Sequence, residues 1–414
     1  MQLVTAIKKW LGPCALAMGL GWASLPVQAW EQNITAVFRP DPTNPMVNKF
    51  QNTTPHSGIC AWHVPALCES FNTFSIRNDA MFFNSIAPIE AFHEDPRKGA
   101  YFKVPSSWRD VQVTHVATGA VETVQMRIAG IGGRWSLGGG VGVSAWNAPG
   151  RPWDHPWRYG VDSCRGVNYI AASTTYLLYF WIVPENGGAC SVIPSTTIPQ
   201  MWYQPVEYGY ELKTPNPLGM ASGEYRGSLT YSIGPGADFD FGDVMIPTDN
   251  VLTFNFDLRV DHILKVELPP GGNRVELLPE GGWQAWLNRG RQPSRLFRDQ
   301  TFRIYSSGHF KMQLECSLVI GNTCGLRNGG GDEVPLQVSV TLPFGLQDQY
   351  GQAVNKLPLR LDGSGSELFQ SGHYVNNRPG SLHFAVERDD VKEMLKQPGS
   401  TYTGVVTVIW DSQV

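Results

Sequence analysis

One short segment of the chain combines aromatic and basic side chains between glycines and prolines. The segment Gly150–Gly160 reads GRPWDHPWRYG. Aromatic rings can stack on a sugar ring or on another apolar ligand face, while guanidinium and imidazole groups supply hydrogen-bond donors. The prolines and flanking glycines predict a loop, where ligand-binding residues tend to lie. The candidate ligand contacts are Arg151, Trp153, His155, Trp157, Arg158 and Tyr159. The alternative is a structural loop whose tryptophans cover the core, because aromatic side chains at loop bases usually pack.

No segment carries a recognisable reaction motif. The sequence has no GxSxG elbow and no HExxH helix, so we expect no catalytic residue and no enzyme. The glycines of Gly132–Gly142 lack the Lys-Ser/Thr of a phosphate loop, and a turn-rich connection is expected there. The tract His93-Glu94-Asp95 lacks metal-ligand spacing, and we expect neither a metal nor a cofactor. An exported all-β hydrolase stays open as an alternative, since histidines and acidic residues are available for a site.

Six of the seven cysteines form pairs that are local in the sequence. The pairs are separated by 8, 26 and 8 residues, and no pair has CxxC spacing. Six cysteines allow 15 connectivities, of which local pairing is the simplest for an oxidising compartment. We therefore expect three structural disulfides. They join Cys60 with Cys68, Cys164 with Cys190, and Cys316 with Cys324.

The first 29 residues have the pattern of a signal peptide. Lys8 and Lys9 precede an apolar stretch over Leu11–Leu25, and Val27-Gln28-Ala29 fits a cleavage site. The mature chain is then expected to start at Trp30 and to be exported. Loss of the two lysines takes the formal net charge from −4 to −6, which argues against a nucleic-acid partner.

The rest of the chain predicts short strands joined by turns. Apolar residues alternate with polar ones almost throughout, and glycine steps separate the alternating runs. Only Asp389–Lys396 has the pattern of a helix. The sequence predicts an all-β protein with two immunoglobulin-like β-sandwich domains in tandem.

A long alternating run from Val251 to Leu268 places the domain boundary. A single strand of this length would span about 55 Å, well beyond the usual ~17–20 Å. Two strands in line, joined at Asp261-His262, explain the run better. The predicted domains are residues 30–260 and 263–414, with 261–262 as a short linker.

The last alternating run predicts a strand that closes the second domain. Val406, Val408 and Trp410 share one face, and Ile409 lies on the other. The run is nearly uncharged and β-branched, which is the kind of edge that attracts other strands.

The order of these features resembles the tip adhesins and initiators of class 5 (alpha-type) chaperone–usher fimbriae, the colonisation-factor and cable-pilus group. The resemblance covers most of the mature chain and is better in the second domain. It rests on the two early cysteine pairs and on three segments: GEYRGSLTYSI (Gly223–Ile233), TFNFDLRVDHILKVELP (Thr253–Pro269) and YTGVVTVIWDS (Tyr402–Ser412).

The resemblance implies that the second domain is an incomplete pilin fold that lacks one strand. A periplasmic pilus chaperone would fill the gap first, and the donor strand of the major pilin subunit would fill it in the fibre, with an outer-membrane usher as the assembly platform. The edge that accepts these strands would comprise Val405, Val406, Val408, Ile409 and Trp410. The alternative is an ordinary closing strand of a complete sandwich.

For the first domain, the resemblance implies an adhesin that binds a host glycan or glycoprotein receptor. The arginines of the family's receptor site are not matched, because their expected places fall near Pro55-His56 and Pro235-Gly236. The segment Gly150–Gly160 is therefore the candidate site. Since a whole domain, and no detached donor arm, follows the predicted cleavage site, we expect a subunit at the fibre tip. It would pass through the periplasm during assembly and end at the fimbrium tip on the cell surface. A tip initiator that binds no receptor is the remaining alternative.

Overall fold

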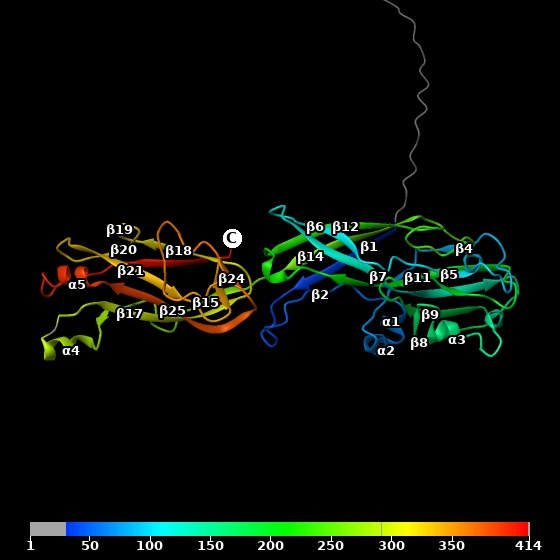
Figure 1. Ribbon diagram of the computed structural model, residues 1–414, viewed down its shortest axis with the longest axis horizontal. Helices are drawn as coiled ribbons and strands as arrows, with labels where there is room; N and C mark the ends of the chain where they lie inside the picture. The colour runs from blue at the N-terminus through cyan, green and yellow to red at the C-terminus, as the bar shows by residue number, and fades with distance from the viewer. Residues whose placement is uncertain (1–29, 291, 413–414) are drawn as a thin grey trace, which may run out of the picture.

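The structure is a computed structural model, and it describes residues 30–290 and 292–412. The predicted signal peptide lies outside the described residues. Two β-rich units follow one another along the long axis of the molecule (Figure 1). We refer to residues 30–260 as the N-terminal unit and to residues 263–412 as the C-terminal unit. The predicted all-β fold class is confirmed.

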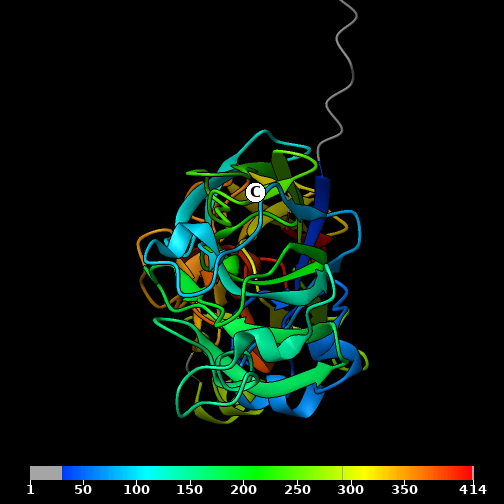
Figure 2. The ribbon, with the colours of Figure 1, turned by 90° about the vertical axis from the view of Figure 1, so that its right-hand side faces the viewer.

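The N-terminal unit is built around one large sheet with the strand order β13-β4-β11-β7-β6-β12-β14-β1-β2. Strand β3 also pairs with β11, β9 joins β7 to β8, and β5 pairs with β10. Figure 2 looks along the long axis from this unit and shows its strands curling around the core. The strands are β1 (Trp30–Phe38), β2 (Gln51–Asn52), β3 (Ile76–Asn78), β4 (Phe83–Ser85), β5 (Ala100–Phe102), β6 (Arg109–His115), β7 (Val121–Gly138), β8 (Arg165–Ala172), β9 (Tyr176–Ile182), β10 (Cys190–Val192), β11 (Gln200–Lys213), β12 (Gly223–Ser232), β13 (Met245–Pro247) and β14 (Val251–Val260).

The C-terminal unit is a sandwich of one larger sheet and smaller strand pairs. The larger sheet has the order β15-β17-β25-β21-β20-β19, with β16 beside β17 and β23 beside β21. The pairs β18-β26 and β22-β24 are separate. The strands are β15 (Leu264–Glu267), β16 (Leu278–Pro279), β17 (Leu296–Ser306), β18 (Lys311–Cys316), β19 (Val319–Ile320), β20 (Thr323–Arg327), β21 (Glu333–Thr341), β22 (Leu346–Asp348), β23 (Leu357–Pro358), β24 (Phe369–Ser371), β25 (Val375–Val386) and β26 (Val406–Asp411).

The expectation of a single helix is wrong. The helix expected near the end of the chain is present, and further short helices lie in the connections of both units. Helices of four to eight residues with mixed polar and apolar side chains are too short to show a helical period, which explains why the sequence pattern missed them. The helices are α1 (Ile59–Trp62), α2 (Pro65–Ser70), α3 (His155–Tyr159), α4 (Gly282–Arg289) and α5 (Arg388–Met394), with 3₁₀ turns η1 (Pro96–Lys98), η2 (Val143–Trp146) and η3 (Pro217–Gly219).

The long alternating run of the sequence forms two strands, β14 and β15, on either side of residues 261–263. Strand β14 lies between β12, which is antiparallel to it, and β1, which is parallel to it. Its even-numbered residues Leu252, Phe254 and Leu258 are fully buried in the core of the N-terminal unit. The apolar face of β14 therefore belongs to the first unit, and β15 opens the sheet of the second.

The glycine-rich segment Gly132–Gly142 was expected to be a turn-rich connection, but residues 132–138 form the C-terminal part of β7. A Cβ on Gly132 would lie 2.3 Å from the carbonyl oxygen of Tyr179, and one on Gly133 would lie 2.2 Å from that of Pro205. Glycine is needed here because the neighbouring strands β9 and β11 approach closely. Only the end of the segment, after β7, turns.

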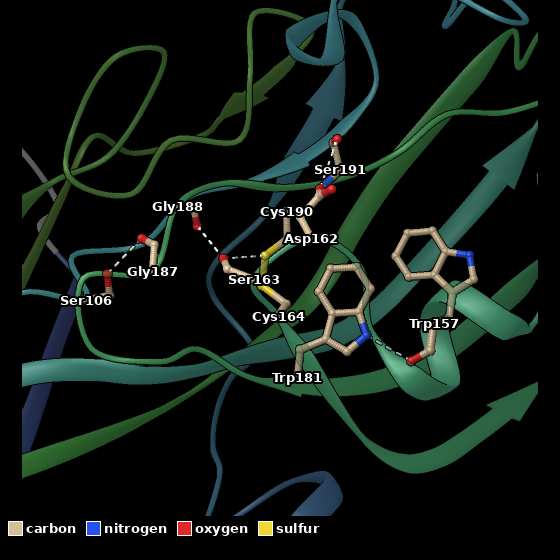
Figure 3. The surroundings of a disulfide bond; sticks show 10 residues. All are labelled: Ser106, Trp157, Asp162, Ser163, Cys164, Trp181, Gly187, Gly188, Cys190 and Ser191. Atoms are coloured by element: carbon tan, nitrogen blue, oxygen red, sulfur yellow. Dashed lines mark hydrogen bonds between the residues drawn. A yellow bond between two sulfur atoms is a disulfide. The ribbon is translucent and has the colours of Figure 1, made fainter.

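The three cysteine pairs are disulfides between near neighbours in the chain. Their sequence separations are 8, 26 and 8 residues. The disulfide Cys164–Cys190, which spans 26 residues, ties the start of the β8–β9 hairpin to β10, on the same side of the unit as the buried rings of Trp157 and Trp181 (Figure 3). The first bridge, Cys60–Cys68, links α1 to α2, and the third links β18 to β20.

Candidate strand-accepting edge and ligand loop

Strand β26, drawn in red beside β18 in Figure 1, is paired along one edge only. It runs antiparallel to β18 from the pair Cys316↔Val406 to the pair Lys311↔Asp411. Within residues 30–290 and 292–412, no other strand is paired with it. From Val406 to Trp410, the second edge of β26 has no described strand beside it and is open to pairing with another strand.

The strand order explains why this edge is open. A seven-stranded immunoglobulin-like sandwich has strands A, B, E and D in one sheet and C, F and G in the other. In chain order, the sheet β15-β17-β25-β21 corresponds to ABED, and the pair β18-β26 corresponds to CF. The described part of the unit has no strand in the position of G, which would lie beside β26.

The inward side chains of β26 are less covered than those of the strand beside it. Met312 and Leu314 on β18 are 1% and 3% exposed. Val406 and Val408 on β26 pack against the same core but are only half-buried. Since both strands face the same core, the difference lies at the open edge, where a further strand would cover the side chains of β26.

One face of β26 points toward the core of the C-terminal unit. Val406, Val408 and Trp410 pack on the core, whereas Ile409 lies on the opposite face. The indole of Trp410 contacts Phe302 and Phe310, with ring centroids 5.0 Å and 5.8 Å away. Val408 is therefore the residue at which an introduced charge should disturb the inward face.

Val405, predicted as part of the edge, does not belong to it. It precedes β26, and its backbone N–H donates to Ser317 Oγ at 3.0 Å. Its carbonyl oxygen accepts from the Ser317 N–H, also at 3.0 Å. Because both backbone groups already have partners, the open edge starts after Val405.

The candidate ligand loop is partly helical, since α3 occupies its second half. Trp157, on this helix, is fully buried, and its expected role as a ligand contact is wrong. Its ring stacks on Trp181 at 5.4 Å and meets Tyr179 at 4.8 Å. Its carbonyl oxygen accepts from Trp181 Nε1 at 2.9 Å (Figure 3). Burial of this large apolar ring against Trp181 and Tyr179 anchors α3 to the core.

Other residues of the loop reach the surface. Arg151 is exposed, and Tyr159 is 52% exposed beside His155, with ring centroids 5.0 Å apart. Arg158 is half-exposed and donates from its Nε and Nη2 to Asp154. Trp153 is half-buried against the core. The surface of this loop, defined here by Arg151, His155, Arg158 and Tyr159, presents an aromatic ring next to hydrogen-bond donors.

A buried carboxylate beneath α1 was missed by sequence analysis. Glu207, in the centre of β11, is 1% exposed, and its Oε2 accepts from the Ile59 N–H at 2.7 Å. A Cβ on Gly58 would lie 2.3 Å from this carboxylate, so residue 58, directly before α1, must be glycine. Burial raises the pKa of Glu207 to about 7. The sequence signal was an acidic residue between Val206 and Tyr208 in a strand rich in aromatic residues.

Replacing Glu207 with glutamine should change how stability depends on pH. The unfolded carboxyl loses its proton near pH 4.5 and the folded one near 7, so the wild type loses stability as pH rises between these values. The pKa difference corresponds to about 3 kcal/mol. Glu207→Gln keeps a side-chain oxygen that can accept from the Ile59 N–H but carries no titratable charge. Its free energy of unfolding, measured with urea from pH 4.5 to 7.5, should therefore not fall over this range. The exposed Glu224→Gln is the control; equal pH slopes for Glu207→Gln and wild type would contradict the assignment.

Within the described residues, no group of three or more His, Cys, Asp or Glu side chains is placed to hold a metal ion. None of the described helices is both long enough and apolar enough to cross a membrane.

Comparisons with known proteins give distant structural likenesses. No family model matches the chain, and no curated protein matches it. Among solved structures, the chain is similar to a chaperone–tip adhesin complex of CFA/I fimbriae biogenesis, at 10% identity and a TM-score of 0.25, covering 92% of this chain and 96% of the other. It is similar to CfaE, the adhesive subunit of the CFA/I fimbria of enterotoxigenic Escherichia coli, at 11% identity and 0.24, covering 92% of each chain.

A third similarity is to the CsuC–CsuE chaperone–tip adhesion subunit complex of archaic Csu pili from Acinetobacter baumannii. The identity is 11% and the TM-score 0.22, covering 92% of this chain and 98% of the other. Identities and TM-scores this low do not assign the chain to a family. The features on which a function can be argued are those of the structure itself. They are the open edge at β26 in the C-terminal unit and the aromatic and basic loop surface on the N-terminal unit.

Proposed function

We propose that this protein is a fimbrial tip adhesin and pilus assembly initiator that joins its fibre through the open edge of β26. The observation that carries the proposal is the C-terminal unit itself: strands A to F of a sandwich, no described strand in position G, and a half-buried apolar face on β26. An edge of this kind, left uncovered, is an aggregation hazard, so a protein that displays one needs a partner.

The partner in this proposal is an added β-strand. Backbone hydrogen bonds along β26 supply affinity, and alternate side chains of the added strand contact the inward face at Val406, Val408 and Trp410. A periplasmic pilus chaperone supplies the strand first, and the major pilin subunit replaces it at an outer-membrane usher. The protein then resides at the fimbrium tip on the cell surface after passing through the periplasm.

The N-terminal unit is the receptor-binding part in this proposal. Its first described strand, β1, pairs in parallel with β14 over nine residues, from Trp30↔Leu252 to Phe38↔Val260. A strand held in its own sheet is not free to complete a neighbouring subunit. The proposed contact surface for a host glycan or glycoprotein is the loop surface of Arg151, His155, Arg158 and Tyr159, with Trp153 behind it.

Substitutions on the two faces of β26 test the strand-addition proposal. The full chain is co-expressed with a periplasmic fimbrial chaperone, and the co-purified complex is quantified. Val408→Asp places a charge on the half-buried inward face and should reduce capture at least tenfold, because an unpaired carboxylate there is poorly solvated. Thr407→Asp, on the exposed face of the same strand, is the matched control and should leave capture within twofold. Equal capture of both variants would overturn the proposal.

A further inference from the structure

The two units meet at His262, whose ring nitrogens bond to both of them. Nε2 lies 2.9 Å from the carbonyl oxygen of Met220 in the N-terminal unit. Nδ1 lies 3.1 Å from Ser307 Oγ in the C-terminal unit. Since a carbonyl can only accept, Nε2 carries the proton, and the hydroxyl of Ser307 donates to Nδ1. Ser307 Oγ also accepts from the Ile263 N–H at 2.9 Å, so this network is satisfied with a neutral imidazole.

The ring of His262 also packs against both the N-terminal and the C-terminal unit. It meets Phe38 of β1 edge-on, with ring centroids 5.6 Å apart. A Cβ on Gly308 would lie 2.7 Å from its Cγ, so the C-terminal unit approaches the ring as closely as only glycine permits. Two further bonds cross between the units: Tyr374 N–H donates to Pro45 at 3.2 Å, and the Asn376 amide donates to Pro42 at 3.4 Å.

We propose that neutral His262 is a latch that fixes the orientation of the two units and that acid releases it. Protonation places a hydrogen on Nδ1, which then points at Ser307 Oγ. The hydroxyl proton of Ser307 must turn away from its acceptor, and Ser307 is fully buried. The new Nδ1–H donates to Ser307 Oγ in its place, so the buried hydroxyl proton of Ser307 is left without its acceptor. An unpaired buried donor, together with a charge between the two units, disfavours the closed arrangement.

Several charged and titratable groups surround His262 where the two units meet. Burial, the largest effect, lowers its pKa below 6.5, and His309 lowers it further. The carbonyls of Met220 and Pro217 and the carboxylate of Asp261 act in the opposite direction. Asp261 is itself held by two arginines, at 2.8 Å and 2.7 Å. The charged and titratable groups that face the joint are Arg39, Glu224, Arg259, Asp261 and His309.

Water reaches the joint through an open cleft of about 600 Å³ that runs along residues 222–224 and 259–262. Proton exchange with His262 therefore does not require unfolding. In the open arrangement its pKa returns toward 6.5, so the open form binds more protons than the closed one below that pH. The ratio of open to closed molecules should rise by up to tenfold per pH unit below 6.5, until the lowered pKa of the closed form is reached.

Interdomain energy transfer between two labels measures the latch in the full chain. Labels are placed at the exposed positions Ser107→Cys in the N-terminal unit and Val319→Cys in the C-terminal unit. Between pH 7.5 and 5.0, the wild type should shift to a broad distance distribution, while near-ultraviolet circular dichroism stays constant. His262→Gln, which can still donate to Met220 but does not titrate, should show the same distribution at all pH values.

His309→Gln is the matched control, because it removes a neighbouring histidine of lowered pKa that makes no bridging bond between the units. It should still show a pH-dependent transition, although the midpoint can move because His309 lowers the pKa of His262. Ser307→Ala removes the bond to Nδ1 and should broaden the distribution at least threefold already at pH 7.5. A wild-type distance that does not change with pH, a transition that survives in His262→Gln, or a closed joint in Ser307→Ala would each overturn the latch.

Discussion

Fusing a β-strand after Val414 through a short turn should raise the melting temperature of the C-terminal unit by about 10 °C. The fused strand would pair with the open edge of β26 and cover its half-buried face. Covering the exposed parts of three apolar side chains should contribute about 3–4 kcal/mol, and each kcal/mol corresponds to about 2–4 °C in a unit of this size. The strand is intramolecular and so acts at a high effective concentration. Differential scanning calorimetry of the full chain provides the measurement.

Two controls separate strand pairing from a nonspecific effect of the extension. A Gly/Ser extension of equal length should leave the melting temperature unchanged. A donor whose apolar residues are shifted by one position would turn them away from Val406, Val408 and Trp410, and should lose most of the gain. If the alternating donor stabilises no better than the Gly/Ser extension, β26 does not accept a strand and the pilus proposal fails.

Trp157→Ala should destabilise the N-terminal unit by about 3–5 kcal/mol, the usual range for removing a large aromatic side chain from a core. The indole is fully buried among Trp146, Tyr179 and Trp181, with ring centroids 4.8–5.4 Å away, so its loss leaves a cavity that rigid neighbours cannot fill. Chemical denaturation followed by tryptophan fluorescence checks the effect. A loss below about 1 kcal/mol would contradict the burial of this residue.

Tyr159→Ala, two positions along the same helix, is the informative contrast. Tyr159 is 52% exposed, and its loss should cost less than about 1 kcal/mol. If the loop surface binds a receptor, Tyr159→Ala and Arg151→Ala should bind a glycan array or host cells at least tenfold more weakly than wild type while remaining folded. Unchanged adhesion would remove this loop from the proposed receptor site and favour a site elsewhere or a tip subunit that binds no receptor.

The strands of the chain were predictable because apolar residues at every second position lie on one face of a strand, and that face must be buried. The run over Val251–Leu268 shows this well: its even-numbered residues are the buried face of β14, and its length required the break before β15. The same logic located β26 and the residues that share each of its faces, whereas the structure showed which face points inward. Which edge of β26 stays open could not be derived, because edges are set by the order of strands in space and not by local alternation.

The candidate site was harder to predict because burial of an aromatic residue depends on distant strands. Trp153, Trp157 and Tyr159 have the same local surroundings in the sequence, yet only Trp157 lies under the rings of β9. Likewise, Gly132 and Gly133 resemble turn residues until β9 and β11 are placed beside them. Glu207 could not be singled out either, because its partner, the Ile59 N–H, is 148 residues away in the chain.

The position of β14 determines how the molecule bears tension. Residues 261–263 connect the C-terminal unit directly to the end of β14, so a pull on that unit acts along the strand. Strand β14 is bonded on both sides, over ten residues to β12 and nine to β1. A force along its axis loads these bonds together, in shear, instead of peeling them apart one at a time. The rate of forced unfolding, and with it the lifetime of an anchored molecule in flow, is then governed by rupture of the whole β12–β14–β1 array.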